Sequence, residues 1–442
     1  MEEVWNQRYR WNCSIFILSY AIMGMATGIT TNVFLSYLDL VAPNIVKGMG
    51  MYTSISSVLI SLLLLVIPKT GYKKMLIGAG ICSSLALFFS GMAHAPSLIA
   101  ILYIIMYVGN SMFDYTYPLL LTTYVPDSLQ VKMFSRTMYI NLLTQTIVTF
   151  FAGKWVVMIF GKLLHTSYQK AATLSSDPSL LTATQKMSYI QSYQRVIYIA
   201  MGLVIAAVIL CFFLKEKKAD YQEQTTKSVE KPKVSFKEKY MPLLSKRVVS
   251  WIAFLIIIQV GASIIAPYFP IFLNTSLHID RGTISTILSL QSLAVVIGYM
   301  ISPWLEKKLG AIGSIGGLLI VVIPLLLLMP NGMMFGSHTA LMIGIILFFR
   351  SGFANASKPI QQSLQMHLVD KSLRPAFSSL MNFVFAILSF LVGLFTRYIL
   401  FVTPAGYGYA YYITSILYAI AIALLFAVFY KKYNRILSDK NK

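Results

Sequence analysis

The sequence predicts an all-α membrane protein whose twelve transmembrane helices form two similar six-helix bundles. Three observations support this fold class: the apolar composition, the number of apolar segments long enough to cross a bilayer, and a polar pattern that occurs in both halves of the chain. Of the 442 residues, 57% are hydrophobic and 12% are charged, and the mean hydropathy is +0.71. This composition is too apolar for a soluble globule and indicates a chain whose solvent is largely lipid.

The apolar segments give the predicted number of spans. A bilayer core about 30 Å thick requires roughly 20 helical residues to cross it. Twelve segments meet this requirement: 12–37, 49–67, 75–93, 97–121, 137–161, 194–214, 248–273, 283–303, 311–329, 339–360, 376–401 and 408–430. The first follows MEEVWNQRYRWN directly, without the cleavage pattern of a signal peptide, so we expect this span to be retained.

The cysteines and the charges indicate how the chain is oriented. Cys13, Cys82 and Cys211 lie in or beside apolar spans, which predicts buried packing rather than a disulfide framework. The formal net charge is +21, but most lysines and arginines fall in segments that lie on one side when both termini are placed inside. The positive-inside rule therefore predicts a multi-pass protein of the cell membrane with both termini in the cytoplasm. The charge would face anionic lipid, and we expect no nucleic-acid partner.

The long polar segments divide the chain. The densely charged segment 215–247 predicts a cytoplasmic linker between an N-terminal bundle, 1–214, and a C-terminal bundle, 248–442. A second polar segment, roughly 165–193, predicts an outer loop.

An internal repeat supports two similar halves. In the fourth span of each half, a polar residue stands four positions before a proline: Asp114 before Pro118, and Asn355 before Pro359. The stretches FSRTM and FSSLM then begin seven residues after an aspartate in the two halves. Order, spacing and position within the six-span block agree, which favours a duplicated bundle.

The whole pattern resembles the major facilitator superfamily of secondary transporters, and the resemblance implies its twelve-helix fold. In that family a loop signature follows the second span of each half: an acidic and a basic residue, then a glycine and further basic residues. The segment PKTGYKK (68–74) matches in part, with Pro68 at the acidic position. The positions that fit are Lys69, Gly71, Lys73 and Lys74.

In the second half, LEKKLG resembles the same signature. Lys308 and Gly310 fit, Lys307 stands at the acidic position, and Glu306 comes one place early. The resemblance implies that these loops clamp helix ends and bias opening towards one side of the membrane. The alternative is plain topology, since any inner loop is expected to be basic.

Asp114 is the acidic residue that the composition does not explain. Of the 15 acidic residues, it is the only one well inside an apolar span. An aspartate at mid-helix costs about 2.5–3.5 kcal/mol on insertion scales, so it should face a cavity or a partner. Tyr103, Tyr107, Asn110 and Tyr117 recur with it at steps of three and four, which predicts one polar and aromatic helix face.

The matching span of the second half carries Arg350, Lys358, Gln361 and Gln365. Arg350 lies about 16 Å from the outer end of its span, close to the bilayer middle. In the superfamily the first and fourth spans of each half line a central cavity. The resemblance therefore implies that Asp114 and Arg350 face one water-accessible space between the halves.

These residues suggest roles, each with an alternative. Asp114 would take up a proton during the cycle or pair with a basic group; otherwise it forms a fixed ion pair that locks one conformation, or a cap. Arg350 would bind an anionic substrate group, whereas Lys358 could simply snorkel. The candidate substrate-binding or proton-coupling residues are Asp114, Arg350, Asn110, Tyr107, Asn355, Lys358 and Gln259.

Helix breaks and hydroxyl groups on the first span of each half complete the candidates. Gln259 precedes PYFP (267–270), where two prolines interrupt the helix, and such breaks often serve as gating points in the family. Thr27, Thr30 and Thr31 line up in the first half. The alternative for these threonines is hydrogen bonding to their own helix backbone.

We therefore predict a proton-coupled secondary transporter, monomeric, that moves a small anionic or amphipathic organic solute by alternating access, in a direction the sequence does not give. No phosphate-binding loop, paired-cysteine site or histidine cluster is present in the sequence, so we expect no enzyme activity, cofactor or metal. Two alternatives remain open: a flippase for lipids or lipid-linked sugars, and a ligand sensor of the same fold that does not transport.

Overall fold

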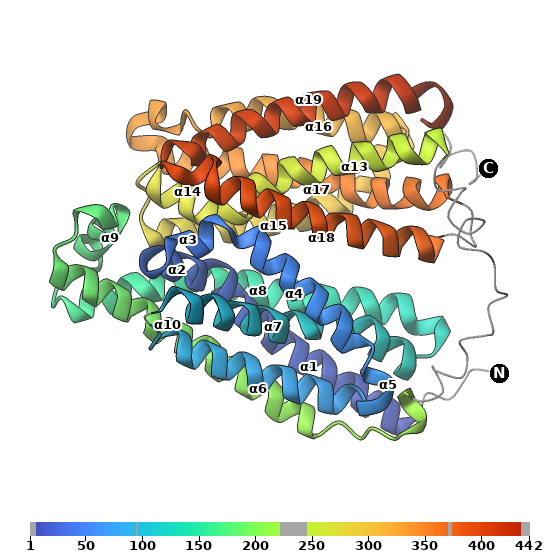
Figure 1. Ribbon diagram of the computed structural model, residues 1–442, viewed down its shortest axis with the longest axis horizontal. Helices are drawn as coiled ribbons and strands as arrows, with labels where there is room; N and C mark the ends of the chain where they lie inside the picture. The colour runs from blue at the N-terminus through green and yellow to red at the C-terminus, as the bar shows by residue number, and fades with distance from the viewer. Residues whose placement is uncertain (1–5, 94, 222–244, 370–373, 435–442) are drawn as a thin grey trace. The chain divides into compact units, whose positions relative to one another are not determined.

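Most of the chain that the computed structural model describes is helical, and the described part excludes residues 1–5, 94, 222–244, 370–373 and 435–442 (Figure 1). The described residues contain no strand, and eleven of their helices are long and apolar enough to cross a membrane. The predicted all-α membrane fold is confirmed, but the count of twelve spans is not. The helix at the second predicted span, α4 (Met49–Leu64), has only 16 residues and ends in a turn before Pro68.

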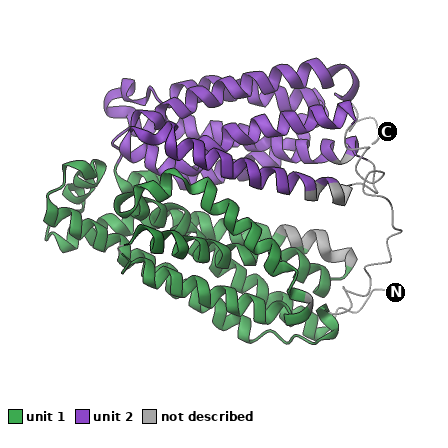
Figure 2. Ribbon diagram, viewed as in Figure 1, with its two compact units in different colours: residues 1–231, 280–286 green, residues 232–279, 287–442 purple. Residues whose placement is uncertain are grey.

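The chain divides into two compact units, residues 1–231 with 280–286 and residues 232–279 with 287–442 (Figure 2). The predicted bundle boundaries remain predictions, because most of the predicted linker lies outside the described residues. The helices that lie in unit 1 are α1 (Gln7–Ile29), a π-helical segment (Thr30–Phe34), α2 (Leu35–Val41), α3 (Pro43–Lys47), α4, α5 (Ile67–Thr70), α6 (Tyr72–Ser90), α7 (Pro96–Tyr124), α8 (Asp127–Leu163), α9 (Tyr168–Ser176), a 3₁₀ turn (Pro178–Leu180) and α10 (Ala183–Phe212).

Small residues and interhelical hydrogen bonds hold α1 against α8 within unit 1. A Cβ atom on Gly24 would lie 2.5 Å from the carbonyl oxygen of Asn141, so only glycine permits this approach of the two backbones. The Asn141 amide donates to the Tyr20 carbonyl at 2.7 Å, and the Thr144 hydroxyl donates to the Ala21 carbonyl at 2.8 Å. Close backbones joined by polar side chains are the usual means of packing helices in lipid.

Unit 2 contains the remaining helices. They are α13 (Lys246–Ile265), a 3₁₀ turn (Ala266–Tyr268), α14 (Phe269–Thr275), α15 (Arg281–Leu309), α16 (Ala311–Leu328), a 3₁₀ segment (Gly332–His338), α17 (Thr339–Leu368), α18 (Arg374–Tyr398), a 3₁₀ turn (Leu400–Val402) and α19 (Ala405–Tyr433), although the first residues of α15 cluster with unit 1. Helix α13 packs against α18 and α19, and α16 packs against α17 and α19. The predicted helix break at PYFP is confirmed by the 3₁₀ turn between α13 and α14.

Two local predictions are wrong. The segment 165–193 is largely helical rather than a loop: it forms α9 and the start of α10. The signal for α10 is the capping box Thr182–Gln185, in which each side chain accepts a hydrogen bond from the other residue's backbone N–H. Cys82 is exposed, whereas Cys13 and Cys211 are buried as predicted. Position within an apolar span does not separate the lipid-facing side of a helix from its packed side.

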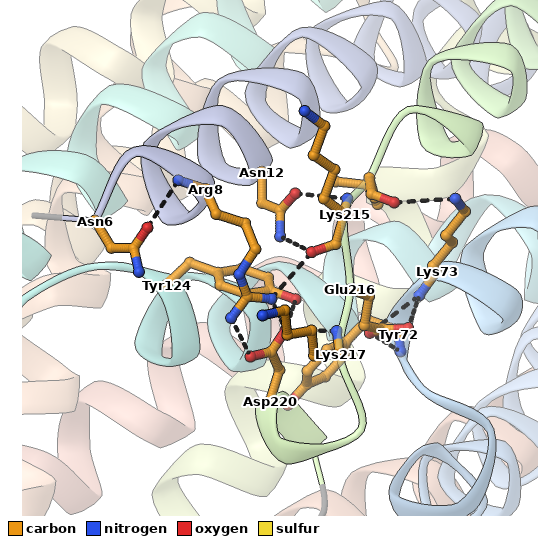
Figure 3. A network of polar contacts seen from close by, with 11 residues as sticks. Asn6, Arg8, Asn12, Tyr72, Lys73, Tyr124, Lys215, Glu216, Lys217 and Asp220 are labelled. Atoms are coloured by element: carbon orange, nitrogen blue, oxygen red, sulfur yellow. Dashed lines mark hydrogen bonds and ion pairs between the residues drawn. The ribbon is translucent and has the colours of Figure 1, made fainter.

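One end of unit 1 is tied together by the residues that follow α10 (Figure 3). Glu216 accepts hydrogen bonds from the backbone N–H groups of Tyr72 at 2.7 Å and Lys73 at 3.3 Å, which satisfies the free donors at the start of α6. The Lys73 ammonium in turn donates to the carbonyls of Phe212 and Leu214 at the end of α10. Glu216 thus satisfies backbone donors at the start of α6, and Lys73 satisfies backbone acceptors at the end of α10.

A second connection at this end joins α1 to the same segment. Arg8 forms a two-pronged ion pair with Asp220, at 2.6 Å and 2.8 Å. Asn12 exchanges two hydrogen bonds with the backbone of Lys215, at 2.8 Å and 3.0 Å (Figure 3). Residues 215–221, which the sequence assigned to the linker, therefore pack on unit 1.

The two carboxyl groups of this segment are perturbed in opposite directions. Burial raises the pKa of Asp220, but the hydrogen bonds from Arg8 and from the Lys217 backbone outweigh it, so the net pKa lies below the ordinary value. For Glu216, burial dominates over the Tyr72 and Lys73 amides, and the pKa is raised. Asp220 therefore stabilises the fold as a carboxylate at neutral pH.

Unit 2 repeats the capping device with different chemistry. The backbone N–H of Ala311 donates to the Asn434 carbonyl at 2.7 Å, and that of Gly313 donates to the Asn434 side chain at 2.8 Å. In both units, a residue just beyond the final helix caps an earlier helix, α6 in unit 1 and α16 in unit 2. In both, a glycine with positive φ precedes that helix: Gly71 at +84° and Gly310 at +77°.

These two glycines generate a stability prediction. With ψ near 165°, both lie in a region that is essentially restricted to glycine, so Gly71→Ala and Gly310→Ala should each lower stability by about 1–3 kcal/mol. Added methyl groups would also meet Glu216 and Asn434. Thermal unfolding in detergent measures the effect. Gly202→Ala and Gly317→Ala, at helical positions with open space around a Cβ, are the controls and should be neutral or stabilising. Equal melting of all four variants would contradict the prediction.

Asp220 generates a pH prediction. Because its folded-state pKa is depressed, its contribution is present above the ordinary value of 3.8 and is lost as the pH falls through the folded value. Asp220→Asn should therefore cost about 2 kcal/mol at pH 7, with the difference from the unmodified protein shrinking below about pH 4. Thermal unfolding across pH 3–7 is the measurement. Asp177→Asn, at a half-buried capping residue that asparagine replaces well, is the control. A difference that stays constant with pH would refute the assignment.

Candidate functional site

A cavity of about 1090 Å³ lies within unit 2, and four of the predicted site residues line it. They are Gln259 of α13 and Arg350, Asn355 and Lys358 of α17. Arg350, Ala354 and Lys358 follow one another at steps of four, so a single face of α17 supplies both cations. The structure therefore brings these four predicted residues together.

Arg350 is the most buried charge of the cavity wall. Its exposed fraction is 4%, and its guanidinium lies 5.3 Å from the centre of the Phe269 ring. Tyr418, 2% exposed, lies against it. Among the described atoms, Arg350 Nε has no hydrogen-bond partner. Since buried donors in proteins are nearly always satisfied, this donor shows that the described residues compensate the Arg350 charge only in part.

Neutral amides make up much of the remaining polar wall. None of the described residues that line the cavity is acidic. The lining amides besides Gln259 and Asn355 are Gln291, Gln361, Gln362, Gln365 and Asn382. Two cations among amides, with no carboxylate to neutralise them, create a cavity suited to an anion that also carries hydrogen-bonding groups.

The proline of the repeat adds a backbone acceptor to each unit. Pro359 lies inside α17 and has no N–H, so the carbonyl of Asn355, four residues earlier, loses its helical partner. Pro118 has the same relation to Asp114 in α7. The repeat found in the sequence thus places a polar side chain on the same residue as a carbonyl that lacks its usual helical donor.

In unit 1, the predicted polar face of α7 points towards α1 and α6. The Tyr20 hydroxyl donates to Asp114 at 2.7 Å, and Tyr20 stacks on Tyr117. Asn110 accepts from Ser83 at 2.7 Å. The partner described for Asp114 within unit 1 is thus a neutral hydroxyl rather than a cation.

Two other predicted groups of unit 1 have more ordinary environments. Tyr107 is half-buried and packs against Tyr103. Thr27 and Thr31 donate to carbonyls four residues earlier in α1, and Thr30 to the carbonyl three residues earlier, which is the backbone alternative stated for them. Because Asp114 and Arg350 belong to different units, a space shared by the two remains a prediction.

The predicted loop residues separate into two groups. Gly71, Lys73 and Gly310 belong to the capping devices described above. The other predicted loop residues take no part in these capping devices. The side chains of Lys69, Lys74, Lys307 and Lys308 are exposed. Glu306 Oε1 is buried and has no partner among the described atoms. Lys308 lies over the Trp304 ring at 4.3 Å. Their role in gating remains a prediction.

Sequence reasoning missed several residues of these sites. Gln291, Asn382 and Tyr418 line the cavity, and isolated amides within apolar spans were the available signal for the first two. Glu216 and Asn434 gave no signal, because their capping partners are distant in the chain. Tyr20, the partner of Asp114, could not be separated from the many other tyrosines.

A buried polar cluster in unit 1 was also missed. Arg281 is fully buried at the start of α15 and donates to Asn32. Asn32 lies in the π-helical segment and donates to Ser285 at 3.1 Å, and Ser285 accepts from the backbone of Gly153 at 2.9 Å. Short π-helical segments occur frequently at functional sites. The signal available was an asparagine within the apolar first span.

Comparison with known proteins identifies the fold. The structure is similar to that of a variant of the nucleoside transporter NupG, with 15% identity, a TM-score of 0.68 and 95% and 100% of the two chains covered. It is also similar to a bacterial homologue of the human lysosomal transporter Spinster, inward-facing and occupied. The identity is 12%, the TM-score is 0.66, and 96% and 98% of the two chains are covered. A third similar structure is that of a variant of the Escherichia coli fucose:proton symporter FucP. The identity is 16%, the TM-score is 0.52, and 95% and 98% of the two chains are covered.

The sequence comparison extends over most of the chain. No curated protein sequence matches. Residues 69–394, however, match the sequence profile of the Major Facilitator Superfamily. This region includes the α7 face, the residues that line the unit 2 cavity apart from Tyr418, and both loop segments apart from Pro68. The predicted resemblance is confirmed: the chain is a multi-pass membrane protein and belongs to the Major Facilitator Superfamily.

Proposed function

We propose that this protein is a proton-coupled secondary transporter of the cytoplasmic membrane, with both termini inside, that moves a small organic anion by alternating access. The observation that carries the proposal is the pair of cations, Arg350 and Lys358, in a cavity lined by amides. The fold is shared with a nucleoside transporter and with a fucose:proton symporter, which supports transport of a polar organic solute.

The chemistry of the cavity favours an anionic group on the solute. A guanidinium buried among helices is costly unless an acceptor compensates it, and a carboxylate or phosphate matches its planar fork of donors. Lys358 adds a second charge on the same wall. The amides of Gln259, Asn355 and Gln291 can donate to and accept from hydroxyl or amide groups on the rest of the solute.

Asp114 supplies a group for proton coupling. A carboxyl group in a membrane-spanning helix, bonded among the described residues to a neutral tyrosine hydroxyl, can exist in both protonation states as its surroundings change during the cycle. Binding a proton at Asp114 in unit 1 while an anion binds at Arg350 in unit 2 would couple the two movements.

Flux measurements in proteoliposomes test the proposed function. Candidate carboxylates and phosphate esters are presented with and without an imposed proton gradient. Accumulation driven by the pH gradient supports the proposal. Lipid translocation without solute flux would indicate a flippase, and saturable binding with no flux would indicate a sensor; either result would overturn the proposal.

Arg350 generates the first functional prediction. Removal of a charge-assisted hydrogen bond costs about 1.5–3 kcal/mol, so Arg350→Gln should raise the apparent KM for the transported anion by roughly 10- to 100-fold. Arg350→Lys should recover only part of the loss, because an ammonium lacks the guanidinium fork. Initial rates of uptake measure both. Lys431→Gln, at the exposed end of α19, is the control. An unchanged KM in Arg350→Gln would exclude the proposed contact.

The second functional prediction concerns Asp114. Asp114→Asn should abolish accumulation driven by a pH gradient and flatten the pH dependence of transport, while exchange of solute down its own gradient persists. Tyr20→Phe keeps the carboxyl group but removes its described hydrogen bond, and should shift the pH profile rather than remove it. Transport by Asp114→Asn with unchanged rate and pH dependence would eliminate the coupling role.

A further inference from the structure

Two further cavities of unit 1 lie next to each other, and we refer to the two together as the depression. One is an apolar groove of about 500 Å³ along α4, α6 and α7. The other is a polar pocket of about 640 Å³ formed by α6 and the residues after α10. Both are lined by Thr70, Lys74 and Gly78, so the apolar groove and the polar pocket adjoin at these residues.

The groove has the character of a surface that contacts lipid. Leu62 and Cys82 on its walls are exposed, and a Cβ on Gly78 would have no atom within 4 Å. From Lys74 to Cys82 the helix rises about 12 Å, so the groove runs well into the membrane-spanning part of α6. The other apolar wall residues are Leu59, Leu63, Met75, Ala79, Ile104, Ile105 and Val108. An apolar groove of about 500 Å³ can accept one acyl chain.

The polar pocket carries an excess of positive charge. Its lining lysines are Lys73, Lys74, Lys215, Lys217 and Lys218. Its carboxylate, Glu216, is occupied by the backbone N–H groups of α6, and the Lys73 ammonium is occupied by carbonyls of α10. The side chains of Lys74, Lys217 and Lys218 are exposed, and none of them forms an ion pair with a described residue.

We propose that this depression binds an anionic phospholipid of the predicted inner leaflet. One acyl chain lies in the groove between α4, α6 and α7, and the phosphate contacts Lys74, Lys217 and Lys218. The apolar groove selects a lipid over a free phosphate, and the lysines select an anionic headgroup over a zwitterionic one. The lipid is a bound ligand here, separate from the solute of the unit 2 cavity.

The location suggests what the lipid does. Lys73 and Glu216 join the start of α6 to the end of α10. Lys74 and Lys217 are their immediate neighbours in the chain. An anionic headgroup would relieve repulsion among the lysines beside this joint. Bound anionic lipid should therefore stabilise unit 1 at this end.

Fluorescence quenching at Cys82 tests the proposal directly. Cys82 is the exposed cysteine, whereas Cys13 and Cys211 are buried, so a bimane label can be directed to the groove. The labelled full-length protein is reconstituted in bilayers that contain either phosphatidylglycerol or phosphatidylcholine with the same brominated acyl chains. We expect brominated phosphatidylglycerol to give the same quenching as brominated phosphatidylcholine at a mole fraction about five-fold lower, or lower still. Equal quenching by the two lipids, or quenching by neither, would overturn the proposal.

Matched lysine variants separate the pocket from general surface charge. In the variant Lys74→Gln/Lys217→Gln/Lys218→Gln, the preference for the anionic lipid should disappear, so that the two brominated lipids quench at about the same mole fraction. Lys307→Gln/Lys431→Gln/Lys432→Gln removes the same charge from exposed positions of unit 2 and should retain the preference. Loss of the preference in both variants would show attraction to the surface alone and would contradict a specific site.

A groove variant and a soluble competitor test the acyl-chain contact. Gly78→Leu fills the junction of groove and pocket, where open space permits the substitution, and should reduce the phosphatidylglycerol retained in native mass spectrometry at least several-fold relative to phosphatidylcholine. Gly202→Leu, at a helical glycine of α10 with equal space, should not. If glycerol 1-phosphate abolishes the preference at equal concentration, the pocket binds the phosphate without a chain and the lipid proposal is wrong.

Discussion

The need to give every charge a partner within a bundle of apolar helices is the constraint on which the rest of the structure depends. Asp220 satisfies it with a two-pronged contact to Arg8, and Glu216 satisfies it with the backbone donors of α6. Arg350 does so only in part: the guanidinium lies over an aromatic ring, and its buried Nε has no hydrogen-bond partner among the described atoms. A buried cation that the protein leaves incompletely compensated is suited to receive its remaining partner from a ligand.

The two units meet the same constraint with the same backbone plan and different side chains. A glycine of positive φ and a residue beyond the last helix cap α6 in unit 1 and α16 in unit 2, with the Glu216 carboxylate in one and the Asn434 amide in the other. A proline four residues after a polar side chain removes a helical hydrogen bond in each, after Asp114 in α7 and Asn355 in α17. The duplicated backbone thus carries an acid in one unit and a neutral amide beside cations in the other.

The sequence predicted what depends on composition and on local spacing. Long apolar runs predicted a helical membrane protein, and steps of three and four correctly placed Asp114 and Asn110 on one face of α7, where both have hydrogen-bond partners. The same spacing placed Arg350 and Lys358 on one face of α17. The family resemblance, which rested on architecture more than on the two loop motifs, is confirmed by the profile match.

What the sequence could not predict depends on contacts between distant segments. Glu216 lies 144 residues from the amide that it caps, and Asn434 lies 121 residues from its partner Gly313. Hydropathy also could not distinguish the buried side of a helix from its lipid-facing side, which is why Cys82 was assigned wrongly and the apolar groove beside it was not anticipated.

Equilibrium binding of matched solutes to the purified protein tests the central claim most directly. Each pair has one organic framework that carries either a carboxylate or phosphate, or the corresponding neutral amide or ester. If Arg350 completes its hydrogen bonds with the solute, the charged member should bind at least about ten-fold more tightly, and this advantage should vanish in Arg350→Gln. Equal affinity for the charged and neutral members of every pair that binds would contradict the account.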